Sequence, residues 1–263
     1  MKWITLLTLF LTLFCQAKAD SMDPQRVGID QNIGQQLPLN LPFRDDEDGQ
    51  EHPLGDYFRS DRPAIMVMGY FECPQLCTVV MNGLVESLTE IKPRVGTSFD
   101  VFFVSIDPNE TAKLGAKKKH SYVKLYGKPE TAHGWHFLTG SQKSISALAQ
   151  AIGFRYQTIP NSTQFAHASG LTVVTPKGKI SQYFYGIEFP PKELVKAIHQ
   201  AGEEKEGNKV KELILLCCQY NPIHGQYGMI IWRTLQVGAA MTLLWLAFFI
   251  VRNLRGPGKE VAS

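Results

Sequence analysis

The amino-acid sequence predicts an α/β fold in which a mixed central sheet is flanked by helices. Two continuous apolar runs, Ala64 to Phe71 and Phe99 to Ile106, are typical of strands buried on both faces. A helical pattern follows each run, and a strand pair joined by a tight turn lies further along the chain. Crossover units followed by a hairpin predict a sheet with both parallel and antiparallel strands.

The predicted elements alternate between strand and helix until the closing hairpin. In chain order they are strand 64–71, helix 78–91, strand 99–106, basic helix 111–126, strand 135–138, helix 141–152, strand 171–174, strand 179–185 and a helix from Pro190 or Pro191 to Gln200. The charged stretch from Gly202 to Glu212 then reads as a linker.

Local signals set the boundaries of these elements. Pro93 ends the first helix, and Asp107-Pro108 ends the second strand. Ser141 is a preferred N-cap residue, and Gly153 is a preferred helix stop. Thr175-Pro176-Lys177-Gly178 is a turn sequence, which makes the last two strands an antiparallel hairpin. The natural candidate for this order of elements is a thioredoxin-like fold.

Composition and charge exclude several classes of protein. With 44% apolar and 19% charged residues, the chain is typical of a globular protein and not of a disordered one. The net charge is +3, and the short run Lys117-Lys118-Lys119 is the only basic cluster we find in the sequence. Because nucleic-acid binding usually needs a basic face, we expect no nucleic-acid partner.

Both ends of the chain carry apolar segments that indicate export and anchoring. Residues 1–19 begin with Met-Lys-Trp, continue through an apolar stretch and close on Ala17-Lys18-Ala19, the pattern of a cleaved signal peptide. Cys15 follows Phe14, where a lipoprotein signal needs a small residue, so we expect Cys15 to be lost with the signal. Near the other end, Thr234 to Val251 carries no charge and approaches the length of about 20 apolar residues that spans a bilayer.

We therefore expect one C-terminal transmembrane helix, for which a buried core helix is the alternative. Arg252, Arg255 and Lys259 follow the apolar run, so the positive-inside rule places the tail in the cytoplasm. In chain order the expected parts are signal peptide 1–19, exported thioredoxin-like domain 20–205, membrane-proximal segment 206–232, transmembrane helix 233–252 and cytoplasmic tail 253–263. The expected location is the bacterial inner membrane, with the functional domain on the periplasmic side.

One pair of cysteines is the main candidate for a functional site. Cys73-Pro74-Gln75-Leu76-Cys77 follows the first buried strand and leads into the first helix. Thiols at positions i and i+4 share one face of a helix's first turn, where unpaired N–H groups and the helix dipole favour thiolate. A structural disulfide is one interpretation in an oxidising compartment, but it would close a very short loop and restrict the unfolded chain little. A redox or metal role is therefore favoured.

The spacing of the cysteines favours a metal. Thiol–disulfide oxidoreductases of this fold usually place two residues between them, whereas three residues leave room for an ion. His167 lies in a small-residue loop before the strand 171–174, at the end of the sheet where Cys73 is expected, although a solvated surface histidine is the alternative. Cys73, Cys77 and His167 would form an S₂N site, which suits Cu(I) or zinc, and Cu(I) best if it is trigonal.

Other metal-binding residue types have weaker placements. The remaining histidines are His52, His120, His133, His136, His199 and His224. Cys217 and Cys218 end an apolar run, and we interpret them as small buried residues. Met66 and Met68 alternate along the first buried strand and are expected in the core rather than on copper.

These residues together resemble the Sco/SenC copper chaperones, which assemble the copper centre of respiratory cytochrome oxidase. The resemblance covers most of residues 30–200, through Gly69-Tyr70-Phe71 before the cysteine motif, Val104-Ser105-Ile106-Asp107-Pro108, and His167 before Leu171. It implies that Cys73, Cys77 and His167 bind copper on a thioredoxin-like domain, and that the cysteines also cycle between dithiol and disulfide.

The chain departs from the family pattern at three points. The family often has proline after the second cysteine and an acidic residue before the histidine, where this chain has Thr78 and Ala166. Better-known members are anchored by an N-terminal helix, whereas the expected anchor here is C-terminal.

The function implied by the resemblance is that of a membrane-anchored metallochaperone. It would deliver copper to the copper-site subunit of a respiratory cytochrome oxidase. The alternative is a thiol–disulfide reductase that acts on the copper-ligand cysteines of an oxidase subunit, with Cys73 attacking and Cys77 resolving the mixed disulfide. We expect an enzyme only in that second case. A peroxidase would need substrate-positioning groups that the sequence does not reveal, and a structural adaptor would not need the cysteine pair.

Overall fold

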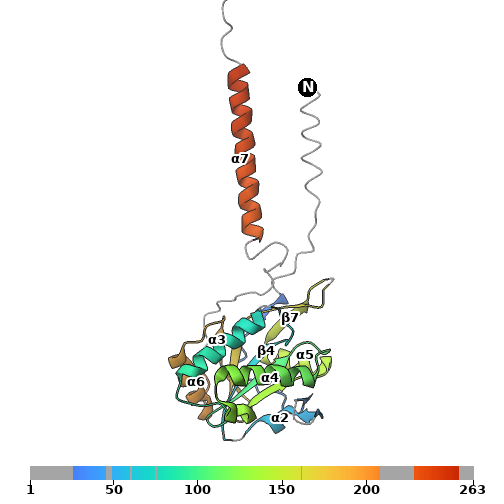
Figure 1. Ribbon diagram of the computed structural model, residues 1–263, viewed down its shortest axis with the longest axis vertical. Coiled ribbons are helices and arrows are strands. Elements are labelled where there is room, and N and C mark those ends of the chain that lie inside the picture. The colour runs from blue at the N-terminus through green and yellow to red at the C-terminus, as the bar shows by residue number, and fades with distance from the viewer. Residues whose placement is uncertain are drawn as a thin grey trace, which may run out of the picture. The chain divides into compact units, whose positions relative to one another are not determined.

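The computed structural model of the protein divides the chain between Cys217 and Cys218 into two compact units (Figure 1). The structure describes residues 26–45, 49–59, 61–74, 76–160, 162–207 and 228–254. The expected signal peptide, His224, Cys217 and Cys218 lie outside the described residues.

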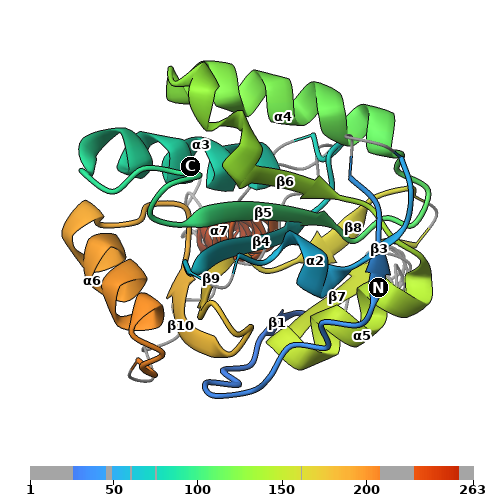
Figure 2. The same cartoon turned by 90° about the horizontal axis from the view of Figure 1, so that it is seen from below.

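A five-stranded sheet forms the centre of the first unit, in the order β10-β9-β4-β5-β6 (Figure 2). Its strands are β4 (Ala64–Gly69), β5 (Asp100–Ser105), β6 (Trp135–Leu138), β9 (Gly170–Val174) and β10 (Ile180–Tyr185). β4, β5 and β6 run parallel, and β9 is antiparallel to both β4 and β10. The predicted mixed sheet is therefore confirmed. Every residue of β4, β5 and β6 is buried, as their apolar character predicts.

Four helices of this unit are those that the sequence predicts. They are α3 (Leu76–Glu90), α4 (Ala112–Tyr126), α5 (Gln142–Ile152) and α6 (Pro191–Gly202). The Ser141 side chain accepts a hydrogen bond from the Ser144 N–H, and Gly153 ends α5 in the left-handed conformation at φ 76°. Both predicted caps of α5 are thus confirmed. α3 packs against α4 and α6, whereas α5 lies beside β7 on the other side of the sheet (Figure 2).

A glycine allows α3 to pack very closely against the segment before α6. A Cβ atom at Gly83 would lie only 1.9 Å from the carbonyl oxygen of Ile187. One turn later, the Ser87 hydroxyl donates to the carbonyl oxygen of Phe189 at 2.6 Å. The position of the helix that carries Cys77 is fixed by these contacts.

A second, three-stranded sheet in the order β1-β7-β8 is not predicted by the sequence. Its antiparallel strands are β1 (Gly28–Ile29), β7 (Phe154–Thr158) and β8 (Phe165–His167). His167 therefore lies on a strand and not in a loop, which corrects the expectation above. The remaining short elements are β2 (Pro42–Phe43), β3 (His52–Pro53), α2 (Leu54–Tyr57) and the 3₁₀ helix η2 (Pro129–Gly134).

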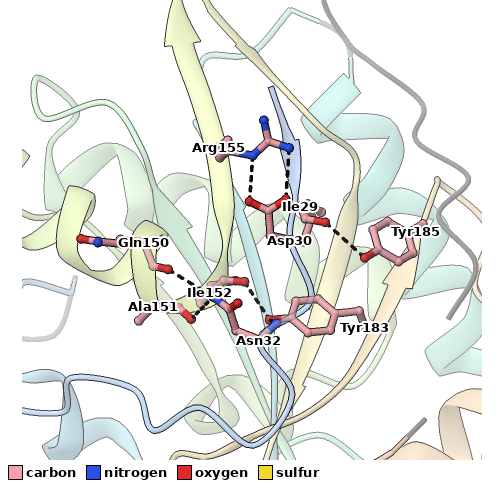
Figure 3. Close-up of polar contacts among 9 residues, drawn as sticks. All are labelled: Ile29, Asp30, Asn32, Gln150, Ala151, Ile152, Arg155, Tyr183 and Tyr185. Carbon is pink, nitrogen blue, oxygen red and sulfur yellow. Dashed lines mark hydrogen bonds and ion pairs between the residues drawn. The ribbon is translucent and has the colours of Figure 1, made fainter. Parts of the chain in front are cut away.

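A network of polar contacts fastens the three-stranded sheet to its surroundings (Figure 3). The Arg155 guanidinium donates to both carboxylate oxygens of Asp30, at 2.9 and 3.1 Å. The buried Tyr183 hydroxyl donates to the carbonyl oxygen of Ile152 at 2.8 Å and accepts from the Asn32 N–H at 3.0 Å. The chain after β1 is thus joined to β7, to the end of α5 and to β10.

The second unit contains the helix α7 (Gly228–Leu254). Its segment Leu235–Arg252 has a mean hydropathy of 1.7 and is long and apolar enough to cross a membrane. Large apolar side chains along this segment are exposed, among them Leu244, Trp245 and Phe248. A helix is therefore present where the sequence predicts the anchor, and it buries none of that segment within the protein.

Candidate metal centre

The two cysteines lie at the connection from β4 to α3. Cys77 is in the first turn of α3, whereas Cys73 precedes the helix. The expectation that both thiols share the first helical turn is therefore wrong for Cys73. Pro74 gives the reason, because the residue before a proline is disfavoured from the helical conformation. Both side chains are buried, with 6% of Cys73 and 3% of Cys77 exposed, and no disulfide joins them.

Main-chain N–H groups contact both sulfur atoms. The Tyr70 N–H donates to Cys77 Sγ at 3.5 Å, and the Cys77 N–H donates to Cys73 Sγ at the same distance. Such contacts stabilise negative charge on sulfur, as a helix N-terminus does. The absence of a side chain at Gly69 gives Cys77 Sγ its space, since a Cβ there would lie 2.9 Å from the sulfur.

The His167 side chain reaches this point from β8. It is only 1% exposed, so the surface alternative is wrong. Its Nδ1 lies 2.9 Å from the carbonyl oxygen of Ala168, and because a carbonyl can only accept, Nδ1 carries the proton. In the neutral imidazole Nε2 then carries the lone pair, and this atom lies 3.1 Å from Cys77 Sγ. Hydrogen bonding of one ring nitrogen to the backbone is the usual arrangement in a metal-binding histidine.

The structure brings together the three residues that the sequence singles out. Cys73 Sγ, Cys77 Sγ and a ring nitrogen of His167 all lie within 4.8 Å of one another. Within the described parts of the chain, no other group of three histidine, cysteine or acidic residues has this arrangement. Two soft thiolates and one imidazole are donors that suit Cu(I), which accepts trigonal coordination, whereas structural zinc takes four ligands. The donor set therefore fits copper.

A buried carboxylate that the sequence analysis missed holds the loop before Cys73. The two carboxylate oxygens of Glu110 accept the N–H groups of Phe71 at 2.8 Å and Glu72 at 2.7 Å, and the Ser105 hydroxyl donates to one of them at 2.6 Å. Burial raises the pKa of Glu110, and these hydrogen bonds oppose that rise. The only sequence signal is its position just after the second strand, at the sheet edge where the cysteine loop begins.

Aromatic rings enclose the imidazole. The Tyr70 ring meets His167 edge-on with centroids 5.9 Å apart, and Phe154 lies at 5.8 Å. Phe165 in turn packs edge-on against Tyr70 at 5.5 Å. The centre is therefore shielded from water on the side of the β7–β8 hairpin, which raises the strength of electrostatic interactions within it.

The other histidines in the described part of the chain do not join the centre. His120 lies on α4 and His199 on α6. His52, His133 and His136 line a separate cavity of about 220 Å³. His136 is buried, and desolvation together with nearby positive charges lowers its pKa to about 3, so it is neutral. Met66 and Met68 are buried in the core, as expected.

Comparison with known proteins gives one family and a set of related folds. Residues 43–203 match the SCO1/SenC family. A candidate electron transfer protein from Aquifex aeolicus has a TM-score of 0.57 and 22% identity, over 69% of this chain and 100% of that chain. BsSco, a member of the Sco family of cytochrome c oxidase assembly proteins, has a TM-score of 0.51 and 20% identity, over 67% of this chain and 99% of its own.

A candidate electron transport protein, also from Aquifex aeolicus, has a TM-score of 0.53 and 22% identity, over 66% of this chain and 100% of that chain. No curated protein sequence matches closely enough to count as a relative. At these identities the solved structures establish the fold, which is mixed α/β and thioredoxin-like.

Proposed function

Because this chain belongs to the SCO1/SenC family, we propose that it is a membrane-anchored copper chaperone for the assembly of a respiratory cytochrome oxidase. Cys73, Cys77 and His167 bind one copper ion, which is the cargo of the protein. The observation that carries this proposal is the convergence of their three ligand atoms within 4.8 Å, at a site suited to copper.

The chemistry of the centre supports Cu(I) as the cargo. Thiolates are soft ligands that prefer Cu(I), and the unprotonated Nε2 of His167 supplies a third donor. Two thiolates and one Cu(I) ion leave a net charge of about −1 by simple addition of the ionic charges. The N–H groups of Tyr70 and Cys77, which donate to the sulfur atoms, offset part of that charge.

The membrane anchor is residues 233–252, which fall within α7. Support comes from the apolar segment Leu235–Arg252 and from its exposed side chains. Positive charges that follow the apolar segment favour a cytoplasmic tail over 253–263. Residues 20–205, exported by the signal peptide 1–19 and joined to the anchor by 206–232, then work on the periplasmic side of the bacterial inner membrane.

The recipient of the copper is the copper-site subunit of the oxidase, which family membership supports. Transfer proceeds by ligand exchange, in which cysteines of the recipient replace Cys73 and Cys77 one at a time. Because the same soft donors are present on both sides, the copper remains bound to thiolate throughout.

An anaerobic Cu(I) titration of the reduced, full-length protein in detergent, against a chromophoric chelator, tests this proposal. We expect one copper ion per chain in the native protein, and loss of tight binding in Cys73→Ser, Cys77→Ser and His167→Ala. His199→Ala is the matched control, because His199 is exposed on α6. Binding that is weak in the native protein, or that is equally tight in His167→Ala and His199→Ala, would disprove the copper site.

A thiol–disulfide reductase remains the second candidate, because Cys73 and Cys77 lie near one another without a disulfide between them and the Cys77 N–H donates to Cys73 Sγ. In that reaction Cys73 attacks a partner disulfide, Cys77 displaces the partner thiol, and two electrons pass to the partner as the Cys73–Cys77 disulfide forms. His167→Ala separates the two functions, since it should remove copper binding and spare reduction of a disulfide-bonded oxidase subunit.

A further inference from the structure

A second polar cavity, of about 220 Å³, shares no residue with the candidate metal centre. Asp56 and Tyr57 of α2, and Arg59 just after that helix, line it together with His136 of β6. Pockets for drug-sized ligands usually measure about 300–1,000 Å³, so this cavity suits a smaller molecule.

The buried imidazole in this cavity has no hydrogen-bond partner. His136 is only 6% exposed, yet no described residue forms a hydrogen bond with either of its ring nitrogens. Its ring packs against Phe102 and Tyr57, with centroids 4.7 and 5.7 Å away. Because His136 is neutral, it offers one N–H donor and one lone pair. A buried polar group without a partner calls for a bound molecule that supplies one.

Opposite charges line the exposed side of the same cavity. Asp56 and Arg59 are three residues apart, and both are exposed. No ion pair in the described part of the chain joins these two side chains to one another. An anionic and a cationic group that face one small cavity without pairing are complementary to a ligand that carries both charges.

We propose that this cavity binds a small zwitterionic α-amino acid with a polar side chain. The ligand carboxylate pairs with Arg59, because a guanidinium matches the geometry of a carboxylate. The ligand ammonium group pairs with Asp56. A hydroxyl side chain such as that of serine can donate or accept, so it satisfies whichever nitrogen of His136 it meets. This site goes beyond the proposed function, since copper binding uses none of these residues.

Two other classes of small ligand fit the cavity less well. Although His52 and His133 also line it, no three metal-binding side chains there converge as those of the candidate metal centre do, within the residues that the structure describes. A simple anion would meet Arg59 but would be repelled by the carboxylates of Asp45 and Asp56. A zwitterion uses both signs of charge.

Calorimetric titration of the copper-free, full-length protein in detergent with L-serine tests the charged contacts. We expect Arg59→Gln and Asp56→Asn each to weaken binding about tenfold, as for a charge-assisted hydrogen bond. Arg94→Gln is the matched control, because Arg94 is exposed and does not line the cavity, and it should bind as the native protein does. Acetate, which lacks the ammonium group, should bind at least tenfold more weakly than L-serine.

Either of two results would overturn the site. A native dissociation constant for L-serine above about 10 mM would leave the cavity to water, which can also satisfy a buried imidazole. Equal affinity for acetate and L-serine would show that the ligand is not recognised as a zwitterion. Both results leave the copper site untouched, since that site is tested by Cu(I) titration.

His136→Phe tests the buried contact, because it keeps an aromatic ring and removes both nitrogens. One hydrogen bond is worth roughly a three- to tenfold change, so the native protein should prefer L-serine over L-alanine by that factor. The preference should disappear in His136→Phe, with L-alanine affinity unchanged. A preference that persists in a folded His136→Phe protein would overturn the role of His136. Circular dichroism checks the fold, and the exposed Asp56 and Arg59 variants decide the proposal if His136→Phe does not fold.

Discussion

The sulfur part and the imidazole part of the candidate centre are held in different ways. Cys73 lies between β4 and α3, and Cys77 lies in the first turn of α3. The buried Glu110 anchors the loop that leads from the carboxyl end of β4 to Cys73. His167 lies on β8 in a separate sheet, which is completed by the two-residue strand β1. One of the contacts that fasten this second sheet, between Asp30 and Arg155, is largely exposed to solvent.

This difference indicates that contacts around the cysteines contribute mainly to stability, whereas contacts around His167 contribute mainly to the placement of the imidazole. Buried contacts around the cysteines are part of the main core, so their loss should destabilise the whole domain. Contacts around β7 and β8 are more peripheral, and their loss should cost less stability while still displacing the imidazole. The predictions below test that division, in decreasing order of expected effect.

Glu110→Ala should have the largest effect. It leaves the buried N–H groups of Phe71 and Glu72 without their acceptor, and each such loss costs about 1–3 kcal/mol. We expect the free energy of unfolding to fall by about 3 kcal/mol in urea denaturation, with weaker Cu(I) binding. Glu110→Gln, which retains one acceptor oxygen, should lose less. A fall below about 1 kcal/mol in Glu110→Ala would show that the cysteine loop is held by other contacts.

Asp100→Asn should change the pH dependence of stability without changing copper binding. Asp100 begins β5, at the opposite end of the parallel strands from the cysteines, and burial raises its pKa from 3.8 to about 6 despite the nearby Arg62. The folded protein thus holds this proton more tightly than the unfolded chain, so stability falls as the pH rises from about 4 to about 6.

The asparagine variant cannot lose a proton and should not show this fall, which is on the order of 2 kcal/mol. Urea denaturation of both proteins across pH 4–7 measures the difference. Parallel stability curves for the two proteins would contradict the raised pKa. Altered Cu(I) affinity at pH 7 would contradict the separation between this end of the sheet and the site.

Tyr183→Phe should cost about 1–2 kcal/mol, because its buried hydroxyl serves both Ile152 and Asn32. We expect a lower melting temperature by calorimetry and a several-fold loss of Cu(I) affinity through displacement of the β7–β8 sheet. Tyr185→Phe is the control, since its hydroxyl is less buried. Full copper affinity in a destabilised Tyr183→Phe protein would show that the imidazole does not depend on this network.

The ion pair between Asp30 and Arg155 should have the smallest effect. Its side chains are 58% and 39% exposed, and exposed pairs contribute about 0–1 kcal/mol. A double-mutant cycle with Asp30→Asn and Arg155→Gln should give a coupling energy in that range, and lower in high salt. A coupling energy above about 2 kcal/mol would make the peripheral sheet as firmly held as the core.

The sequence predicts the central sheet well because its strands are continuous apolar runs with clear stops. The strand over 135–138 and the caps of α5 agree with the structure residue by residue. β7 and β8 are missed for a physical reason. β7 has partly exposed residues from Arg155 to Gln157, β8 has only three residues, and their pairing depends on partners that a local pattern does not contain.

The candidate site shows the same limit. The cysteine spacing and the position of His167 suffice to name the three residues, because their chemistry is local to each side chain. The contribution of Glu110 depends on contacts with residues elsewhere in the chain, such as Phe71 and Ser105. An ordinary acidic residue carries no spacing signal in a single sequence, so only the folded structure reveals it.

The N–H groups that donate to the sulfur atoms have an evolutionary consequence. Both N–H groups belong to the main chain, at Tyr70 and Cys77. A substitution therefore cannot remove either group, unless it places a proline at that position. A related protein that keeps the backbone turn between β4 and α3 therefore keeps the N–H donors around its thiols, even when the side chains nearby are substituted. Sequence divergence around such a centre is therefore tolerated more readily than around one built from side-chain donors, each of which a single codon change can remove.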